Sequence, residues 1–132
     1  MTRLIDILDA PAHNGVYRLD GPIPELPRMI HLDARRHPAK KDLLRALGKA
    51  LRFPDYYGAN WDAFEECLHD LSWWDGPIVV AIEHADALSP ADRDTLIDIW
   101  SGAAAGWSEA GRGCVLLLDT RSGPSLPVLT MG

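Results

Sequence analysis

Five carboxylates and no lysine or arginine lie between Pro54 and Leu71, in the stretch PDYYGANWDAFEECLHDL. Carboxylates beside a histidine can ligate a metal, act as a general acid and base, or bind a positively charged partner. They can also form an ordinary solvated surface. Exposed helices usually mix both signs of charge, because opposite charges three or four residues apart stabilise the helix. The uniform charge of this stretch therefore needs an explanation.

The spacing of the residues predicts an amphipathic helix from Trp61 to about Ser72, with Asn60 as its N-cap. At 100° per residue the side chains divide between two opposite faces. The apolar face holds Ala63, Phe64, Cys67, Leu68 and Leu71. The polar face, here called the acidic stripe, holds Asp62, Glu65, Glu66, His69 and Asp70. We expect the acidic stripe to be exposed and contiguous.

Metal and catalytic chemistry are both disfavoured for the acidic stripe. Glu66 and His69 have the i, i+3 spacing of di-iron bundles, but such sites need a matching second helix, and no other segment repeats the pattern. The chain has no HExxH, paired CxxC, GxSxG, P-loop or GxGxxG motif. A convex polar face also lacks the cleft that separates the pKa values of catalytic carboxylates. We therefore expect no metal, no cofactor and no enzymatic activity.

Two interpretations of the acidic stripe remain. It binds a protein partner, or it is an ordinary solvated face. Tyr56 and Tyr57 lead directly into it, and tyrosine is a common interface anchor because it buries area while keeping a polar tip. We expect one of the two tyrosines to be a core residue that fixes the loop. The exposed Asn60 and the missing lysines favour a partner over a solvated face.

Composition indicates one globular domain in a reducing compartment. A chain of 132 residues can bury a core without disulfides, and Cys67 and Cys114 are predicted to be free, buried thiols. Asp6 and Asp9 interrupt the N-terminal apolar residues, so we expect no signal peptide and a cytoplasmic location. The net charge of −6 argues against nucleic acid as a direct ligand. The segment Arg28 to Arg52 is basic, whereas Phe53 to Asp92 contains no lysine or arginine.

The remaining periodicities predict an α/β domain with a small parallel sheet. Apolar runs indicate strands within 28–34, 78–82 and 113–119, and helical spacing indicates helices over 38–53 and from Ser89 to near Gly111. Residues 1–27 are interpreted as an extension with a candidate short strand at 15–19. Residues 121–132 are interpreted as a loose tail.

The segment FPDYYGANWDAFEECLHDL resembles the signature loop and helix of the barstar family, the intracellular inhibitors of barnase-type ribonucleases. The similarity extends more weakly from about Arg28 to Asp119, which suggests a barstar-like domain over 28–120. The resemblance implies a three-stranded parallel sheet packed with about four helices. It also implies that the loop and helix block a nuclease active site, with carboxylates in place of RNA phosphates.

Carried over residue by residue, the resemblance places Tyr56, Asn60 and Asp62 at contact positions of the family. Glu66 falls where the family has its dominant aspartate, and Glu65 falls where the family has a tryptophan. Three further positions differ from the family, which has threonine, glycine and tryptophan in place of His69, Asp70 and Leu71. A later acidic contact would fall near Ser108 or Glu109.

These observations predict a monomeric, cofactor-free inhibitor of a basic ribonuclease or nuclease toxin. The predicted partner-binding residues are Tyr56, Asn60, Asp62, Glu65, Glu66, His69 and Asp70. Because several contact positions differ from the family, we expect a nuclease other than barnase as partner. The alternative is a non-catalytic interaction or regulatory module that uses the same fold on a partner other than a nuclease.

Overall fold

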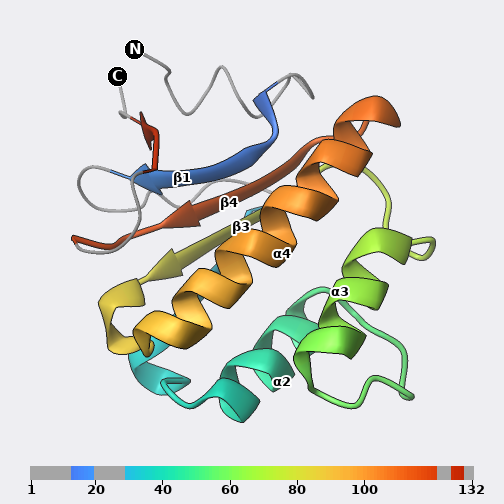
Figure 1. The fold of residues 1–132 in the computed structure, drawn as a ribbon. Coiled ribbons are helices and arrows are strands. Elements are labelled where there is room, and N and C mark those ends of the chain that lie inside the picture. The colour runs from blue at the N-terminus through green and yellow to red at the C-terminus, as the bar shows by residue number, and fades with distance from the viewer. Residues whose placement is uncertain (1–12, 20–28, 122–125, 130–132) are drawn as a thin grey trace.

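The computed structural model describes residues 13–19, 29–121 and 126–129 of the chain (Figure 1). Five parallel strands form one sheet in the order β2-β3-β4-β1-β5. Their bounds are β1 Gly15–Leu19, β2 Ile30–Asp33, β3 Ile78–Glu83, β4 Cys114–Leu118 and β5 Val128–Leu129. The α-helices are α2 Lys40–Ala50, α3 Trp61–Asp70 and α4 Pro90–Glu109, and short 3-10 helices span Ala34–Arg36 and Ala85–Ala87.

The predicted α/β class and parallel sheet are confirmed, but the expected count of three strands is wrong. β1 lies in the stretch interpreted as an extension and pairs with β4, so the candidate strand at 15–19 is confirmed as an inner strand. β5 lies in the stretch interpreted as a loose tail, yet it pairs with β1, and Leu129 is fully buried. The described residues contain three α-helices where about four were expected. The domain boundaries at 28 and 120 stay a prediction, although the sheet continues across both.

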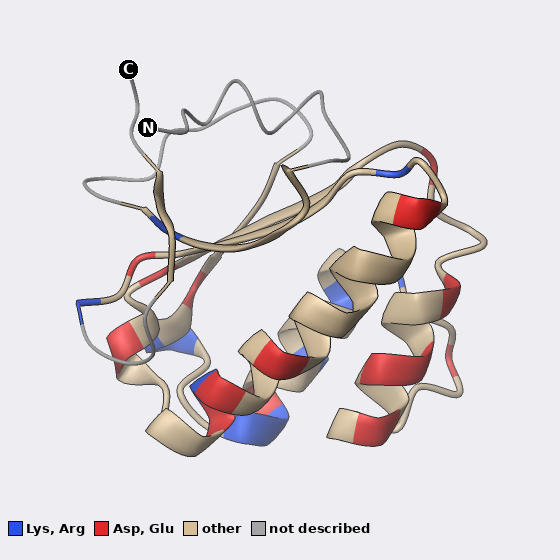
Figure 2. Ribbon diagram, turned by 45° about the horizontal axis from the view of Figure 1, so that its top comes forward, with Lys and Arg blue, Asp and Glu red and all other residues tan. Residues whose placement is uncertain are grey.

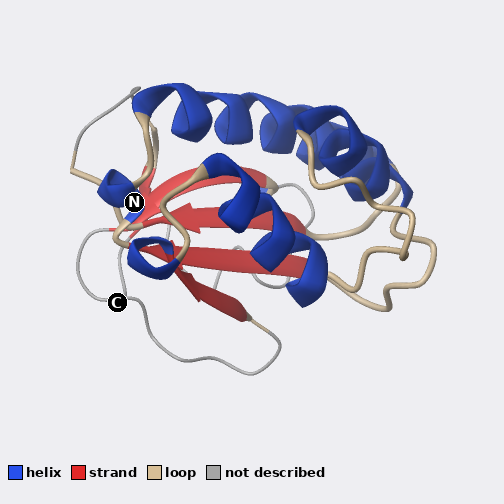
Figure 3. Cartoon of the chain, turned by 90° about the horizontal axis from the view of Figure 1, so that it is seen from below, coloured by secondary structure: helices blue, strands red, loops and turns tan. Residues whose placement is uncertain are grey.

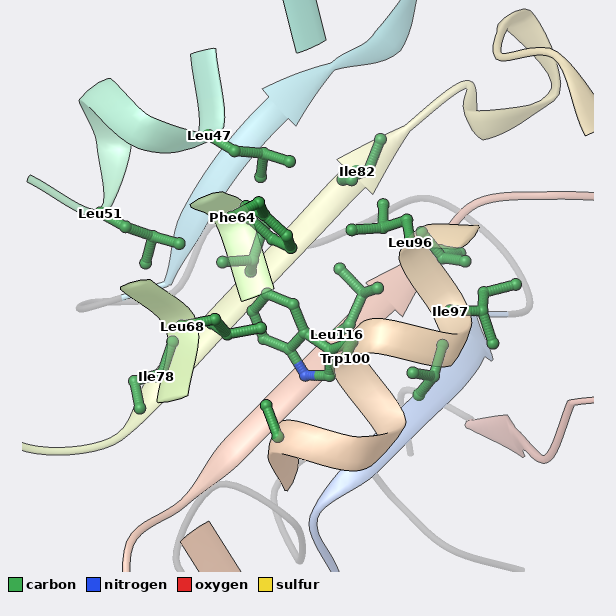
Figure 4. Packing of buried hydrophobic residues seen from close by; sticks show 14 of the residues in the cluster. Leu47, Leu51, Phe64, Leu68, Ile78, Ile82, Leu96, Ile97, Trp100 and Leu116 are labelled. Carbon is green, nitrogen blue, oxygen red and sulfur yellow. The ribbon is translucent and has the colours of Figure 1, made fainter. Parts of the chain in front are cut away.

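The three α-helices cover one face of the sheet (Figures 1 and 3). Alternate residues of β3 divide between the two faces: Ile78, Val80 and Ile82 join the helices in the larger core, and Val79 and Ala81 join a smaller cluster. Trp100 of α4 and Phe64 of α3 pack in the larger core beside Leu116 of β4 (Figure 4). Both aromatic side chains are fully buried, so α3 and α4 are held on the sheet by large apolar contacts.

Local sequence signals account for the helix starts. Ser89 accepts a hydrogen bond from the backbone nitrogen of Asp92 at 3.1 Å, with Pro90 as the first helical residue, as predicted for α4. Both cysteines are free and buried, also as predicted. Among the described residues, no helix is long and apolar enough to cross a membrane.

Candidate functional site

Helix α3 begins at the predicted cap. The side-chain oxygen of Asn60 accepts a hydrogen bond from the backbone nitrogen of Ala63 at 2.8 Å, which satisfies one of the free amide groups of the first turn. The helix ends at Leu71, whose left-handed backbone (φ 39°) turns the chain away. The cap occupies the oxygen of Asn60, so its amide NH₂ is the group that a partner can reach.

The two faces of α3 are divided as the spacing predicted. Phe64 and Leu68 are buried in the larger core, Cys67 is buried beside them on the helix, and Leu71 at the end of the helix is fully buried as well. All five residues of the acidic stripe are exposed. The acidic positions recur along α3, which carries no lysine or arginine (Figure 2).

The two tyrosines before α3 have different environments. The side chain of Tyr56 is 74% exposed, the most exposed large hydrophobic side chain among the described residues. Tyr57 is half-buried, and its hydroxyl donates a hydrogen bond to the carbonyl oxygen of Leu44 in α2 at 2.9 Å. The expectation that one tyrosine fixes the loop is therefore confirmed for Tyr57, and Tyr56 is left free on the surface.

Packing among aromatic side chains supports the loop that precedes α3. Phe53 contacts Tyr57 and Trp73 edge-on, with ring centroids 4.9 Å and 6.0 Å apart. The Tyr57 ring lies against Gly48 so closely that a methyl group there would stand 2.7 Å from Tyr57 Cδ2. Gly48 is thus required by the close approach of the ring to α2.

Two residues of the loop adopt a left-handed backbone without being glycine. Arg52 has a φ of 56° and Ala59 a φ of 52°. Such conformations cost of order 1–2 kcal/mol each and persist only where the surrounding contacts enforce them. The hydrogen bonds from Phe53 to Gly48 and from Tyr57 to Pro54 supply part of that enforcement. These contacts therefore favour one conformation of the loop in the free chain.

The C-terminal half of α3 is tied to α4 and the segment after it. The indole nitrogen of Trp107 donates to the carbonyl oxygen of Leu68 at 2.9 Å. The Arg112 guanidinium donates to the carbonyl oxygens of Leu71 and Trp74 and lies over the Trp107 ring, 4.8 Å from its centroid. These contacts join the last turn of α4 to the end of α3, and Glu109, two residues after Trp107, is exposed.

The stripe is negative without local compensation. Among the described residues, none of its four carboxylates takes part in an ion pair. Burial raises the pKa of the Cys67 thiol, and the charges of Glu66 and Asp70 raise that pKa further. The negative charge of the stripe therefore also acts on the apolar face of α3. The surface thus offers four free carboxylates on a rigid helix, suited to a cluster of cations on a partner.

The predicted site residues all lie in one loop–helix unit. Tyr56 and Asn60 belong to the loop, and the other predicted residues belong to the acidic stripe. Which of them touch a partner stays a prediction. The sequence predicted a supporting role for one of the two tyrosines without telling which, and it did not identify Gly48 and Trp107 as supports, because these roles depend on contacts with α2 and α3 from distant segments.

Comparison with solved structures shows the fold. One chain of a solved structure described as "Structure of Drosophila ORC bound to DNA" superposes with a TM-score of 0.53 and 17% sequence identity. The match covers 95% of the present chain and 32% of that chain, so the present chain spans about a third of its length. No match was found among curated protein sequences.

A family model described as "Barstar (barnase inhibitor)" matches residues 28–119. The matched segment includes the loop, the acidic stripe and strands β2, β3 and β4, and it leaves β1 and β5 outside. The exposed, rigidly supported acidic loop and helix lie within it. The chain belongs to the barstar family.

Proposed function

We propose that this protein inhibits a basic ribonuclease or nuclease toxin by placing Tyr56, Asn60 and the acidic stripe in the active-site cleft of the enzyme. Barstar-family proteins are inhibitors rather than enzymes, and membership implies binding to a barnase-like ribonuclease. In this proposal the free chain is a cytoplasmic monomer that forms a stoichiometric complex without a cofactor. Its carboxylates occupy the positions of RNA phosphates.

The observation that carries the proposal is the set of four exposed carboxylates without a partner cation among the described residues. A ribonuclease cleft must be basic to hold RNA, so a negative helix face is attracted to it and paired on arrival. The rigid support of the loop favours tight binding, because little conformational entropy is lost on association.

The differences from the family pattern favour a partner other than barnase. Glu66 carries the charge of the aspartate that the family has at this position, but one methylene further from the backbone. A glutamate loses more rotamer freedom than an aspartate when it is fixed. A partner suited to Glu66 therefore presents its cations about one carbon–carbon bond further from α3.

The test is truncation of the central carboxylates, Glu66→Ala and Asp62→Ala. Breaking a buried charge pair at an interface costs about 2–5 kcal/mol, so we expect each variant to weaken inhibition of the cognate ribonuclease by at least about tenfold. Thermal stability should be unchanged or slightly higher, because these exposed carboxylates repel their neighbours. The matched control is Asp98→Ala, which removes an exposed carboxylate from α4.

The outcomes separate two functions. Inhibition that survives Glu66→Ala, Asp62→Ala and the double variant would overturn the inhibitory role of the stripe. A partner protein that is not a nuclease and that binds the same variants more weakly would favour the interaction module instead. The cognate nuclease can be identified by affinity capture from the native host with the wild-type chain, using the double variant as the negative control.

A further inference from the structure

A second group of ligand-forming side chains lies at the carboxyl ends of β2 and β3. Asp33 and Glu83 are the last residues of these strands and stand opposite each other in the parallel register. His84 follows Glu83 directly. In α/β sheets, ligands bind outside the carboxyl ends of the strands, where side chains from separate segments meet.

The geometry of the group fits one metal ion. One ligand atom from each of Asp33, Glu83 and His84 lies within 4.8 Å of the other two. Zinc–oxygen and zinc–nitrogen bonds are about 2.0–2.2 Å long, so two ligands of one tetrahedral zinc ion stand about 3.3–3.6 Å apart. The three side chains therefore have to approach one another by up to about 1.5 Å to coordinate one ion.

His31 supplies a fourth candidate ligand. It stands two residues before Asp33 on β2, which places both side chains on the same face of the sheet. The Nε2 atom of His31 lies 2.8 Å from Oε1 of Glu83, but the contact lacks hydrogen-bond geometry. This nitrogen is buried and forms no hydrogen bond among the described residues, so the Glu83 carboxylate, at ion-pair distance, is the group that it faces.

Neighbouring groups orient the candidate ligands. Nε and an Nη atom of Arg35 donate to the Asp33 carboxylate at 3.0–3.3 Å. Asp119 accepts a hydrogen bond from the backbone nitrogen of His84 at 3.1 Å and lies 3.6 Å from its Nδ1. Carboxylates placed beside ligating histidines are typical of metal sites.

The group also has room for an ion and its water. A cavity of about 470 Å³ is lined by His31, Asp33 and Glu83 and by their neighbours Leu32, Arg36 and His37, whereas His84 lies beside it and is not part of its lining. His31, Asp33 and Glu83 project to the face of the sheet that Val79 and Ala81 share, opposite the face covered by the helices. The cluster is therefore separate from the acidic stripe.

We propose that His31, Asp33, Glu83 and His84 bind a divalent transition-metal ion, with Zn²⁺ as the best match. Two imidazoles and two carboxylates suit a borderline ion such as Zn²⁺, whereas Ca²⁺ takes six or more oxygen ligands. The ion would join the carboxyl ends of β2 and β3. Binding to the folded state alone stabilises that state in proportion to the logarithm of the metal concentration.

Isothermal titration of the full chain with Zn²⁺ in chelator-treated buffer tests this site. We expect one ion per chain, a higher melting temperature with Zn²⁺, and much weaker binding of Ca²⁺. Glu83→Gln should weaken Zn²⁺ binding by at least about tenfold. His84→Asn should do the same, and asparagine tolerates the left-handed backbone of this position (φ 54°).

His13→Gln is the matched control, because His13 is an exposed histidine outside both the cluster and the acidic stripe. We expect it to leave the Zn²⁺ affinity unchanged. No heat of binding in the wild-type chain, or equal Zn²⁺ affinity in Glu83→Gln, His84→Asn and the wild type, would overturn the proposal. Nuclease inhibition with and without EDTA is measured in parallel. Inhibition that EDTA leaves unchanged would show that the metal site and the inhibitory stripe act independently, so each proposal is tested by its own measurement.

Discussion

The hydroxyl of Tyr57 donates to the carbonyl oxygen of Leu44 at 2.9 Å, and this bond fixes the loop before the acidic helix to the basic helix α2. The adjacent residue, Tyr56, remains exposed. Two neighbouring tyrosines therefore divide the tasks of positioning the loop and presenting a side chain to a partner. Stability and binding can be perturbed separately at these two positions.

Tyr57→Phe removes this hydrogen bond and keeps the ring packing. We expect the free energy of unfolding to fall by about 1 kcal/mol, the usual net contribution of one such bond. Inhibition of the cognate nuclease should weaken, because the loop is less firmly held. Urea denaturation measures the first effect and inhibition titration the second.

Tyr56→Phe is the control for that variant, since its hydroxyl is on the surface. An equal loss of stability in Tyr56→Phe would contradict the division of tasks between the two tyrosines. Gly48→Ala should reproduce the effect of Tyr57→Phe or exceed it, because the added methyl group displaces the Tyr57 ring.

The proposed inhibition predicts a strong effect of salt on association. If the acidic stripe is attracted to a basic cleft, the association rate constant with the cognate nuclease should fall steeply between low and physiological ionic strength. The dissociation rate constant should change much less. Stopped-flow mixing at several salt concentrations measures both, and a salt-independent association rate would argue against phosphate mimicry.

The two cysteines are expected to support the fold and take no part in inhibition. Cys67 and Cys114 are buried and free, and Cys114 belongs to the larger core. Cys67→Ala and Cys114→Ala should each lower the free energy of unfolding by about 1 kcal/mol through lost packing, with inhibition intact. A variant that folds normally but fails to inhibit would show a functional role for that thiol.

We also expect the buried thiol of Cys114 to make the fold less stable at alkaline pH. Burial raises the pKa of its thiol from the ordinary 9.0 to about 12. Above pH 9 the unfolded chain releases this proton while the folded chain keeps it, so ionisation favours unfolding until the pH exceeds 12. The wild type should lose up to about 1.4 kcal/mol per pH unit relative to Cys114→Ala in this window. Parallel denaturation curves for both chains that keep a constant difference from pH 8 to pH 11 would contradict it.

The helix that carries the candidate site could be predicted from the sequence because its determinants are local. Asn60 caps α3 through a residue three positions away, and the 3.6-residue period alone separates the acidic stripe from Phe64 and Leu68. Strands β3 and β4 could likewise be predicted from their apolar runs, since a strand buried on both faces does not alternate apolar and polar residues.

The edges of the sheet and the proposed metal cluster depend on the tertiary structure. β1 pairs with β4 about a hundred residues away, and β5 has only two residues, too few for any periodicity to be recognised. Asp33 and Glu83 are fifty residues apart and meet only because β2 and β3 pair in one parallel register. The acidic stripe follows from the sequence alone, because neighbouring residues along one helix set its geometry. Which distant side chains face each other depends on the folded sheet, because strand register is set by packing across the whole core.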